Sequence, residues 1–308
     1  MSMNDPLTPP SRFLIVGAFF IIYVAWGVSF LFIGQGVQSI GPLYFVGLRW
    51  GFAGLILLTI TGGWTRLPKR KELPRILISG LFLYVLGNGG VSLAMRWVPS
   101  GIAALIVATT PLWLLIIHWA VGRRLNYRWQ IWPGILCGML GVALLVFEGP
   151  TRDGGMASRW PFALLLIATA CWTVGTVYVT HHRKAVKILH DEIGFQMLAG
   201  GIMLFILSAL CGESFVWPSA STWGGLGYLV LIGSILGMGS YQYLLGHVSP
   251  VMVSTYSFVN PLVALLIGAL FANEKVSLST VISTLLIIVS VVFLLKSGAP
   301  EEDLGTGA

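Results

Sequence analysis

An otherwise apolar run is interrupted at Gly87-Asn88-Gly89-Gly90, and a similar interruption follows in the second half of the chain, at Gly237-Met238-Gly239-Ser240-Tyr241-Gln242-Tyr243. The shift that places Gly87 on Gly237 also aligns further pairs: Val98 with Val248, Pro111 with Pro261, and Leu112 with Leu262. Single matches in apolar sequence arise by chance, but these keep one register over a long stretch. The shift therefore indicates two related halves.

The composition indicates a membrane protein. Only 9% of the 308 residues are charged, 56% are hydrophobic, and the mean hydropathy is +0.87. A soluble domain carries about 25% charged residues. The chain is therefore not an ordinary cytosolic or secreted enzyme, a coiled coil or a disordered protein. The net charge of +7 does not indicate nucleic-acid binding, because the basic residues form short clusters between apolar runs.

Ten apolar runs have about the length of 20 residues that a bilayer-spanning helix needs. They cover 13–33, 43–63, 74–95, 99–121, 130–148, 160–180, 192–212, 222–245, 251–271 and 279–296. We therefore predict an all-α polytopic membrane protein with ten transmembrane helices. Five spans per half is an odd number, so the second half starts on the opposite side of the membrane. That makes the halves inverted five-helix repeats, as in many secondary transporters.

The predicted organisation has five parts. The first repeat covers 13–148 and the second covers 160–296, joined by a linker at 149–159. An N-terminal tail, 1–12, and a disordered acidic and Gly-rich tail, 297–308, flank them.

Lysines and arginines predict the orientation. One side of the predicted membrane holds most of them: Arg12, Arg66, Lys69, Arg70, Lys71, Arg75, Arg123, Arg124, Arg128, Arg183, Lys184, Lys187 and Lys296. The other side holds Arg96, Arg152, Arg159 and Lys275. This bias predicts cytoplasmic N- and C-termini in a bacterial inner membrane.

One stretch resembles a known family. The run from Ala94 through Arg96-Trp97-Val98-Pro99-Ser100-Gly101 to Leu105, followed by Thr110-Pro111, is similar to the signature of EamA-type transporters of the drug/metabolite transporter superfamily. A degenerate copy runs from Val248-Ser249-Pro250 through Asn260-Pro261 to Asn273-Glu274-Lys275. Many members carry a Gly-Glu pair at the end of helix 4. This chain has Arg123-Arg124 there and keeps only Glu274, in the second half.

The resemblance implies ten helices in two EamA repeats. It also implies a cavity lined by helices 1–4 and 6–9, with helices 5 and 10 packed behind it. The implied activity is export of metabolites or amino acids, with aromatic amino-acid exporters among the relatives.

Charged residues inside the spans are few. None of the eleven acidic residues falls in the middle of a predicted span. A cation exporter driven by protons usually needs such a carboxylate, so the sequence favours facilitated movement, or coupling through another group, over proton/cation antiport. His118, near the end of the fourth span, is the next candidate for proton transfer, although an interfacial histidine is the simpler interpretation.

Arg49, in the second span, has two interpretations. Its long side chain reaches the interface, or it faces the mouth of a cavity. In the second case it attracts a carboxylate or pairs with Glu148 or Glu274.

Polar groups on the interrupted helices indicate a binding site. The glycines suit close helix packing, but the amides of Asn88 and Gln242 are costly in lipid without a partner or a wet cavity. Thr110-Pro111 and Asn260-Pro261 form a second related pair. A proline inside a span frees a carbonyl for a polar neighbour or a ligand, although a simple kink is the alternative.

Aromatic residues inside the spans predict the walls of the site. Trp26 and Trp172 occupy related places in the two halves, and aromatic walls with a few polar groups suit a small amphipathic solute. Packing or lipid contact is the alternative for each aromatic residue alone. The predicted substrate contacts are Trp26, Tyr84, Asn88, Ser92, Thr110, Trp113, Trp172, Thr176, Tyr241, Gln242, Tyr256 and Asn260. Arg49, His118 and Glu274 are predicted to act in gating or as charges.

We therefore expect a secondary transporter that exports small amphipathic metabolites, foremost amino acids including aromatic ones, by alternating access. A broad drug efflux pump is the alternative. An intramembrane lipid-modifying enzyme is a remote one, because the sequence has no HExxH motif and no carboxylate pair. No catalytic residue, metal or cofactor is expected, and the three cysteines form no CxxC motif. The expected partners are the solute and the bilayer, with the chain as a monomer or homodimer.

Overall fold

Helices account for the regular structure of the described chain. The computed structural model describes residues 12–120, 131–148, 159–181 and 190–296, apart from 215, 249, 254, 273 and 275. Seven helical stretches there are long and apolar enough to cross a membrane: Arg12–Ser39, Pro42–Thr61, Leu73–Ala94, Ser100–Ile117, Trp160–His181, Asp191–Leu210 and Ala220–His247. Three shorter apolar helices, Trp132–Leu145, Val259–Phe271 and Leu278–Ser290, lie where further spans are predicted. The all-α fold is confirmed, and the count of ten spans stays a prediction.

The first half contains α1 (Arg12–Ser39), α2 (Pro42–Thr61), the short η1 (Gly63–Thr65), α3 (Leu73–Ser79), η2 (Gly80–Gly89), α4 (Gly90–Ala94), α5 (Ser100–Val107), α6 (Thr110–Ala120) and α7 (Ile131–Glu148). The second half contains α8 (Trp160–His181), α9 (His190–Leu210), α10 (Ala220–Tyr228), η3 (Leu229–Leu236), α11 (Gly237–His247), α12 (Pro250–Val253), α13 (Tyr256–Phe271) and α14 (Leu278–Lys296). The predicted linker and tails lie outside the described residues, except for Arg12 and Arg159.

Two wide helical segments occupy corresponding places in the two halves. η2 and η3 are π-helical, with backbone bonds from residue i to residue i+5, and each continues directly into an α-helix. The sequence predicts interrupted helices here. The structure corrects this, because the helices change to wider π-helical turns at these places and continue without a break. π-Helical turns are rare and often mark functional sites.

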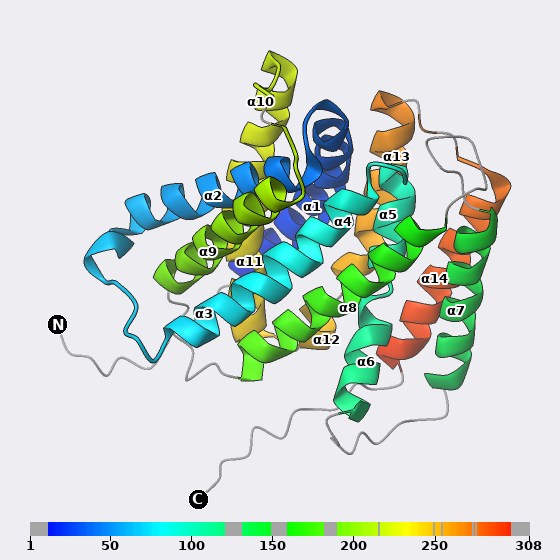
Figure 1. Cartoon of the computed structure of the whole chain (residues 1–308). Helices are drawn as coiled ribbons and strands as arrows, with labels where there is room; N and C mark the ends of the chain where they lie inside the picture. Colours follow the sequence, from blue (N-terminus) through cyan, green and yellow to red (C-terminus); the bar gives the residue numbers. More distant parts are fainter. Residues whose placement is uncertain are drawn as a thin grey trace, which may run out of the picture.

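The helices pack in a pattern that repeats when the halves are exchanged. α2 packs along α9, and α7 packs along α14, as Figure 1 shows for the latter pair. The third rod, α3–η2–α4, packs against α8, and the related rod, α10–η3–α11, packs against α1. This pattern fits the two repeats predicted from the sequence.

α2 and α9 run antiparallel to each other. Glu213, just after α9, accepts bonds from the backbone N–H groups of Leu43 (3.1 Å) and Tyr44 (2.8 Å) at the start of α2. Arg66, just after η1, pairs with Asp191 in the first turn of α9 (3.2 Å). Equivalent helices that run in opposite directions are what inverted repeats produce.

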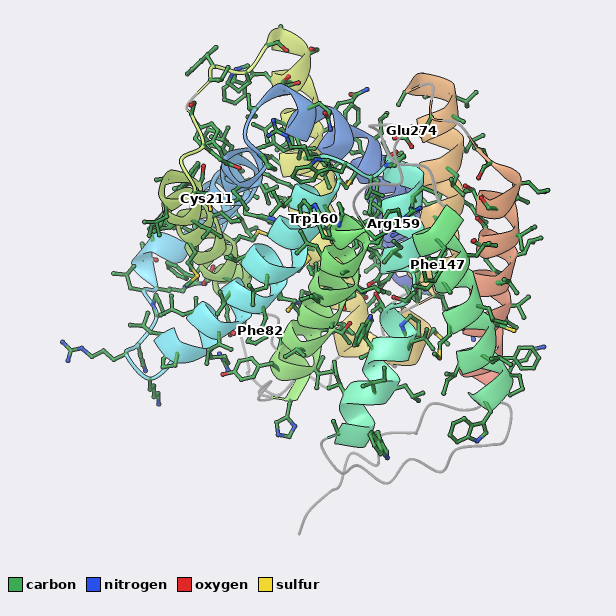
Figure 2. All side chains as sticks on the ribbon, turned by 45° about the vertical axis from the view of Figure 1, so that its right-hand side comes forward. Phe82, Phe147, Arg159, Trp160, Cys211 and Glu274 are labelled. Carbon is green, nitrogen blue, oxygen red and sulfur yellow. The ribbon has the colours of Figure 1, made fainter. Side chains whose placement is uncertain are left out.

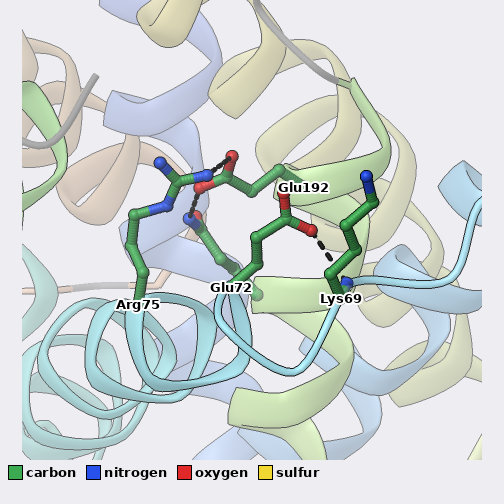
Figure 3. Close-up of polar contacts among 5 residues, drawn as sticks. Lys69, Glu72, Arg75 and Glu192 are labelled. Atoms are coloured by element: carbon green, nitrogen blue, oxygen red, sulfur yellow. Dashed lines mark hydrogen bonds and ion pairs between the residues drawn. The ribbon is translucent and has the colours of Figure 1, made fainter. Parts of the chain in front are cut away.

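Charges of one half also bind the other half at further places. Arg75 on α3 pairs with Glu192 on α9, whose second oxygen accepts a bond from Gln196 (3.1 Å) (Figure 3). Glu274, which is labelled in Figure 2, lies between α13 and α14. Its carboxylate accepts bonds from the N–H (2.8 Å) and hydroxyl (2.8 Å) of Ser100 at the start of α5. A carboxylate at a helix N-terminus is favourable, because the free N–H groups there carry partial positive charge.

Candidate substrate-binding site

Four aromatic side chains from four helices meet inside the bundle. The ring of Trp26 (α1) lies 5.0 Å from Tyr256 (α13) and 5.2 Å from Tyr241 (α11), measured between ring centroids. The ring of Trp172 (α8) lies 6.1 Å from both Trp26 and Tyr241. These separations are typical of favourable aromatic pairs. We call these four residues the central aromatic cluster.

Gly87 and Gly237, in corresponding places of the two halves, leave room for the side chains of Trp172 and Trp26. A Cβ atom at Gly87 would lie 3.2 Å from the Cβ of Trp172, and one at Gly237 would collide with the indole of Trp26. The indole nitrogen of Trp26 also donates to the carbonyl of Gly233 on η3 (3.0 Å). These two glycines therefore serve close packing, one of the two interpretations of the sequence.

A first cavity lies against the central aromatic cluster. The space between its walls measures about 650 Å³ and includes space that is open to the surroundings. Its lining comes from both halves: Trp26, Ser29, Phe30, Ile33, Arg49, Trp50, Gly87, Asn88, Val91, Val107, Thr169, Trp172, Met238, Tyr256 and Asn260. Mostly apolar walls with a few polar groups are typical of small-molecule sites.

A second, smaller cavity lies on the other side of the cluster. It encloses about 290 Å³ and is lined by Thr110, Leu114, Thr173, Thr176, Tyr241, Leu245 and Tyr256. Of the residues that the structure describes, only Tyr256 lines both cavities. The first cavity follows α1 toward its C-terminal end, whereas the second follows α8 and α11 toward theirs, at the opposite end of the bundle. The central aromatic cluster therefore separates the two cavities.

The amides of the first cavity are anchored to the backbone. Asn88 donates to the carbonyl of Leu83, five residues earlier (3.2 Å). Asn260, with its amide oriented to suit its neighbours, donates to the carbonyls of Tyr23 (2.9 Å) and Ile22 (3.2 Å). Because these bonds use N–H groups, the amide oxygen of each residue is left as an acceptor for a ligand.

Arg49 lines the first cavity from the middle of α2. The residue is 3% exposed, and its Nε donates to the hydroxyl of Ser234 on η3 (2.9 Å). The interpretation of Arg49 as an interfacial side chain is wrong, because this burial is too deep. Pairing with Glu274 is also wrong, because that carboxylate binds the start of α5. The side chains of Glu148 and His118 lie outside the described part of the chain.

Several predicted contacts lie away from both cavities. Tyr84 is buried behind the wall, with its ring 4.3 Å from that of Trp50. Gln242 is buried on α11, where its neighbour Tyr241 faces the second cavity, and one step along a helix turns a side chain by about 100°. Ser92 is buried, Trp113 is half-buried, and neither lines the first or the second cavity. The sequence predicted the level of these residues along each helix, but not which face of the helix carries them.

Thr110, next to Pro111, bonds to the backbone and lines the second cavity. Pro111 cannot donate to the carbonyl of Val107, and the hydroxyl of Thr110 donates to it instead (2.6 Å). Thr110 and Thr176 line the second cavity, where the Thr176 hydroxyl lies 3.2 Å from that of Tyr241. Sequence reasoning missed Ser29, Trp50 and Thr169. The tryptophan directly after Arg49 was the one available signal.

The sequence model of the EamA-like transporter family matches residues 13–147 and 159–296. The chain belongs to the EamA-like transporter family. It is 37% identical over 268 residues to the "Uncharacterized inner membrane transporter YedA" of Escherichia coli (strain K12), a match that covers 85% of this chain and 84% of the relative. These findings confirm the resemblance seen in the sequence, and with the long apolar helices they make the chain a multi-pass inner membrane protein.

Two further proteins of the family are more distant. The "Uncharacterized transporter YvbV" of Bacillus subtilis (strain 168) is 27% identical, over 97% of this chain and 96% of its own length. The "Probable amino-acid metabolite efflux pump" of Escherichia coli (strain K12) is 24% identical, over 83% and 86%. A solved structure titled "Crystal structure of protein" matches with a TM-score of 0.65 and 19% identity, covering 92% of this chain and 96% of that one. This last likeness concerns the fold.

Proposed function

We propose that this protein exports small amphipathic metabolites, foremost amino acids including aromatic ones, by alternating access. The observation that carries the proposal is the first cavity, which is lined by both halves and combines aromatic walls with a few anchored polar groups. Aromatic walls bind the apolar body of a solute, and sparse polar groups orient it. The name of one relative, "Probable amino-acid metabolite efflux pump", agrees with this class of solute.

The arrangement of the cavities supports the mechanism. A solute in the first cavity has to pass the central aromatic cluster to reach the second. Inverted halves have two equivalent arrangements, so a rocking of one half against the other closes one cavity as it opens the other. In the described part of the chain no carboxylate lines either cavity, which supports facilitated movement over proton exchange.

Efflux from proteoliposomes tests this proposal. Vesicles loaded with labelled phenylalanine should lose the label only when they contain the protein, with little dependence on an imposed pH gradient. Trp172→Ala should slow this efflux, because it removes aromatic contact area from the wall. Trp132→Ala is the matched control, because Trp132 lies on α7 and is 71% exposed.

Other outcomes contradict the proposal. Efflux of a cationic dye without efflux of phenylalanine would favour the drug pump. Chemical conversion of the solute would favour an enzyme. Equal efflux by the Trp172→Ala and Trp132→Ala variants would place the site outside the first cavity.

A further inference from the structure

We propose that Arg49 is the anion-binding residue of the first cavity, and that the transported solute carries a carboxylate on an apolar or aromatic body. This inference rests on the proposed function, because it names the class of solute that the cavity takes. It goes beyond the proposed function in two ways: a solute needs a carboxylate to bind in the first cavity, and cations do not bind there.

Arg49 is a buried cation with one neutral hydrogen-bond partner in the described structure. A guanidinium group carries five N–H donors, and only Nε is bound, to the hydroxyl of Ser234. The guanidinium carbon lies 4.5 Å from the ring centroid of Trp50, a favourable cation–π contact that supplies no counter-charge.

The five carboxylates whose side chains the structure describes are bound elsewhere. They are held by the start of α2 (Glu213), the start of α5 (Glu274), Arg66 (Asp191), Arg75 (Glu192) and the Lys69 backbone (Glu72). Among the carboxylates whose side chains the structure describes, which leaves out Glu148, none pairs with Arg49. An unpaired charge inside a membrane protein is strongly unfavourable, and such residues normally mark the path of a substrate or ion.

The backbone beside Arg49 keeps the guanidinium open to the cavity. A Cβ atom at Gly233 on η3 would lie 3.4 Å from Nη2 of Arg49 and 2.7 Å from the hydroxyl oxygen of Ser29. The glycine therefore leaves this corner of the cavity uncovered. A carboxylate suits it, because its two oxygens accept two parallel bonds from one guanidinium group.

The rest of the first cavity fits the rest of such a solute. Trp26, Trp172 and Tyr256 offer ring faces and edges to an aromatic body. The amide oxygens of Asn88 and Asn260 accept bonds from an amino group where the solute has one. The same cavity disfavours a cationic drug, because Arg49 repels it.

Four probes that share a phenyl ring isolate the charge requirement. They are phenylacetate (an anion), phenylalanine (a zwitterion), and phenylalaninamide and phenethylamine (two cations). Binding to the full-length protein in nanodiscs is read from tryptophan fluorescence, since three tryptophans line the cavity. We expect the two carboxylates to bind at least about tenfold more tightly than the two cations.

Two variants connect the preference to Arg49. Arg49→Gln should abolish the preference for carboxylates over cations. Without ligand, this variant should be at least as thermostable as the wild type, because the substitution removes an unpaired buried charge. Arg49→Lys keeps the charge without the planar fork, so it should keep the preference with weaker affinity. It also serves as the test if Arg49→Gln does not fold. An unchanged preference in Arg49→Gln, or unchanged carboxylate affinity in Arg49→Lys, overturns the assignment.

Efflux of the same probes separates this inference from the proposed function. Carboxylate binding that depends on Arg49, without efflux, upholds the anion site and overturns the transport proposal. Equal efflux of phenethylamine and phenylacetate upholds transport and overturns the anion site. Binding of none of the four probes overturns the proposed class of solute.

Discussion

Trp26 has two roles that a single side chain rarely combines. Its ring contacts three other aromatic rings of the central aromatic cluster, and its indole N–H donates to the carbonyl of Gly233 on the wide helical segment η3. The bond fixes the ring plane, so the cluster has a defined geometry. A side chain held in this way presents a rigid wall to a solute.

Asn88 and Gln242 form a matched pair for testing the site. Asn88→Ala should weaken binding of phenylalanine by roughly 1–3 kcal/mol, about one to two decades in affinity, because it removes an amide that lines the cavity. Gln242→Ala also removes a buried amide, but from a residue that lines neither cavity, so affinity should stay unchanged. Calorimetry, with the amount of folded protein measured in parallel, checks both. The reverse order of effects would move the site to α11.

The sequence predicted the aromatic part of the site better than the polar part. Trp26 and Trp172 were paired because they occupy related places in the two halves, and the structure brings their rings together. The choice between Asn88 and Gln242 depends on the rotation of each helix about its own axis. Uniformly apolar helices leave this rotation undetermined, because every face of such a helix is compatible with lipid.

At the scale of the helix, glycines in or next to η2 and η3 allow close packing against α8 and α1. Gly237 follows η3 directly and faces the indole of Trp26, while Gly87 lies in η2 and faces Trp172. The sequence located both places through their glycines. It did not indicate the wide turns, because the bonding register of a helix depends on the bulky side chains packed against it from neighbouring helices.

Two glycines of α11 offer a direct comparison. Gly237→Ala places a methyl group against the indole of Trp26, so we expect a displaced ring and about tenfold slower efflux or more, the scale at which core overpacking acts. Gly239→Ala places its methyl group where no heavy atom lies within 4 Å, and its efflux should match the wild type. Transport rates at equal protein level check the pair. Full activity of Gly237→Ala would mean that the position of Trp26 is unimportant for transport.

At the scale of the whole molecule, the two halves are fastened to each other at both ends of α2 and α9. Glu213 binds one end of this pair, and the ion pair of Arg66 with Asp191 binds the other. The inverted repeats were predictable from the sequence, since they depend on the number and order of apolar runs, whereas the packing of α2 against α9 was not. The fastening contacts were not predictable either, because loop residues show no periodic pattern.

The orientation of the molecule is a separate prediction. The excess of lysine and arginine on one side predicts that both termini lie in the cytoplasm. Reporter fusions after Ala308 should be active with a cytoplasmic reporter and silent with a periplasmic one. A fusion after Gly212, between α9 and α10, serves as the control and should give the opposite result. Periplasmic activity at the C-terminus would contradict the span count or the charge bias.

The wide turns of η2 and η3 are places where the helical stretches α3–η2–α4 and α10–η3–α11 can change their backbone bonding. A π-helical turn, bonded from i to i+5, holds one residue more than an α-helical turn, bonded from i to i+4. When such a turn tightens, that residue leaves it, and the rest of the helix rotates about its axis by about 100°. Each backbone group exchanges one partner for the next, so no donor is stranded in hydrocarbon. Asn88 stands near the end of η2. If one turn of η2 tightens in this way, the amide of Asn88 leaves the cavity wall and a neighbouring side chain takes its place.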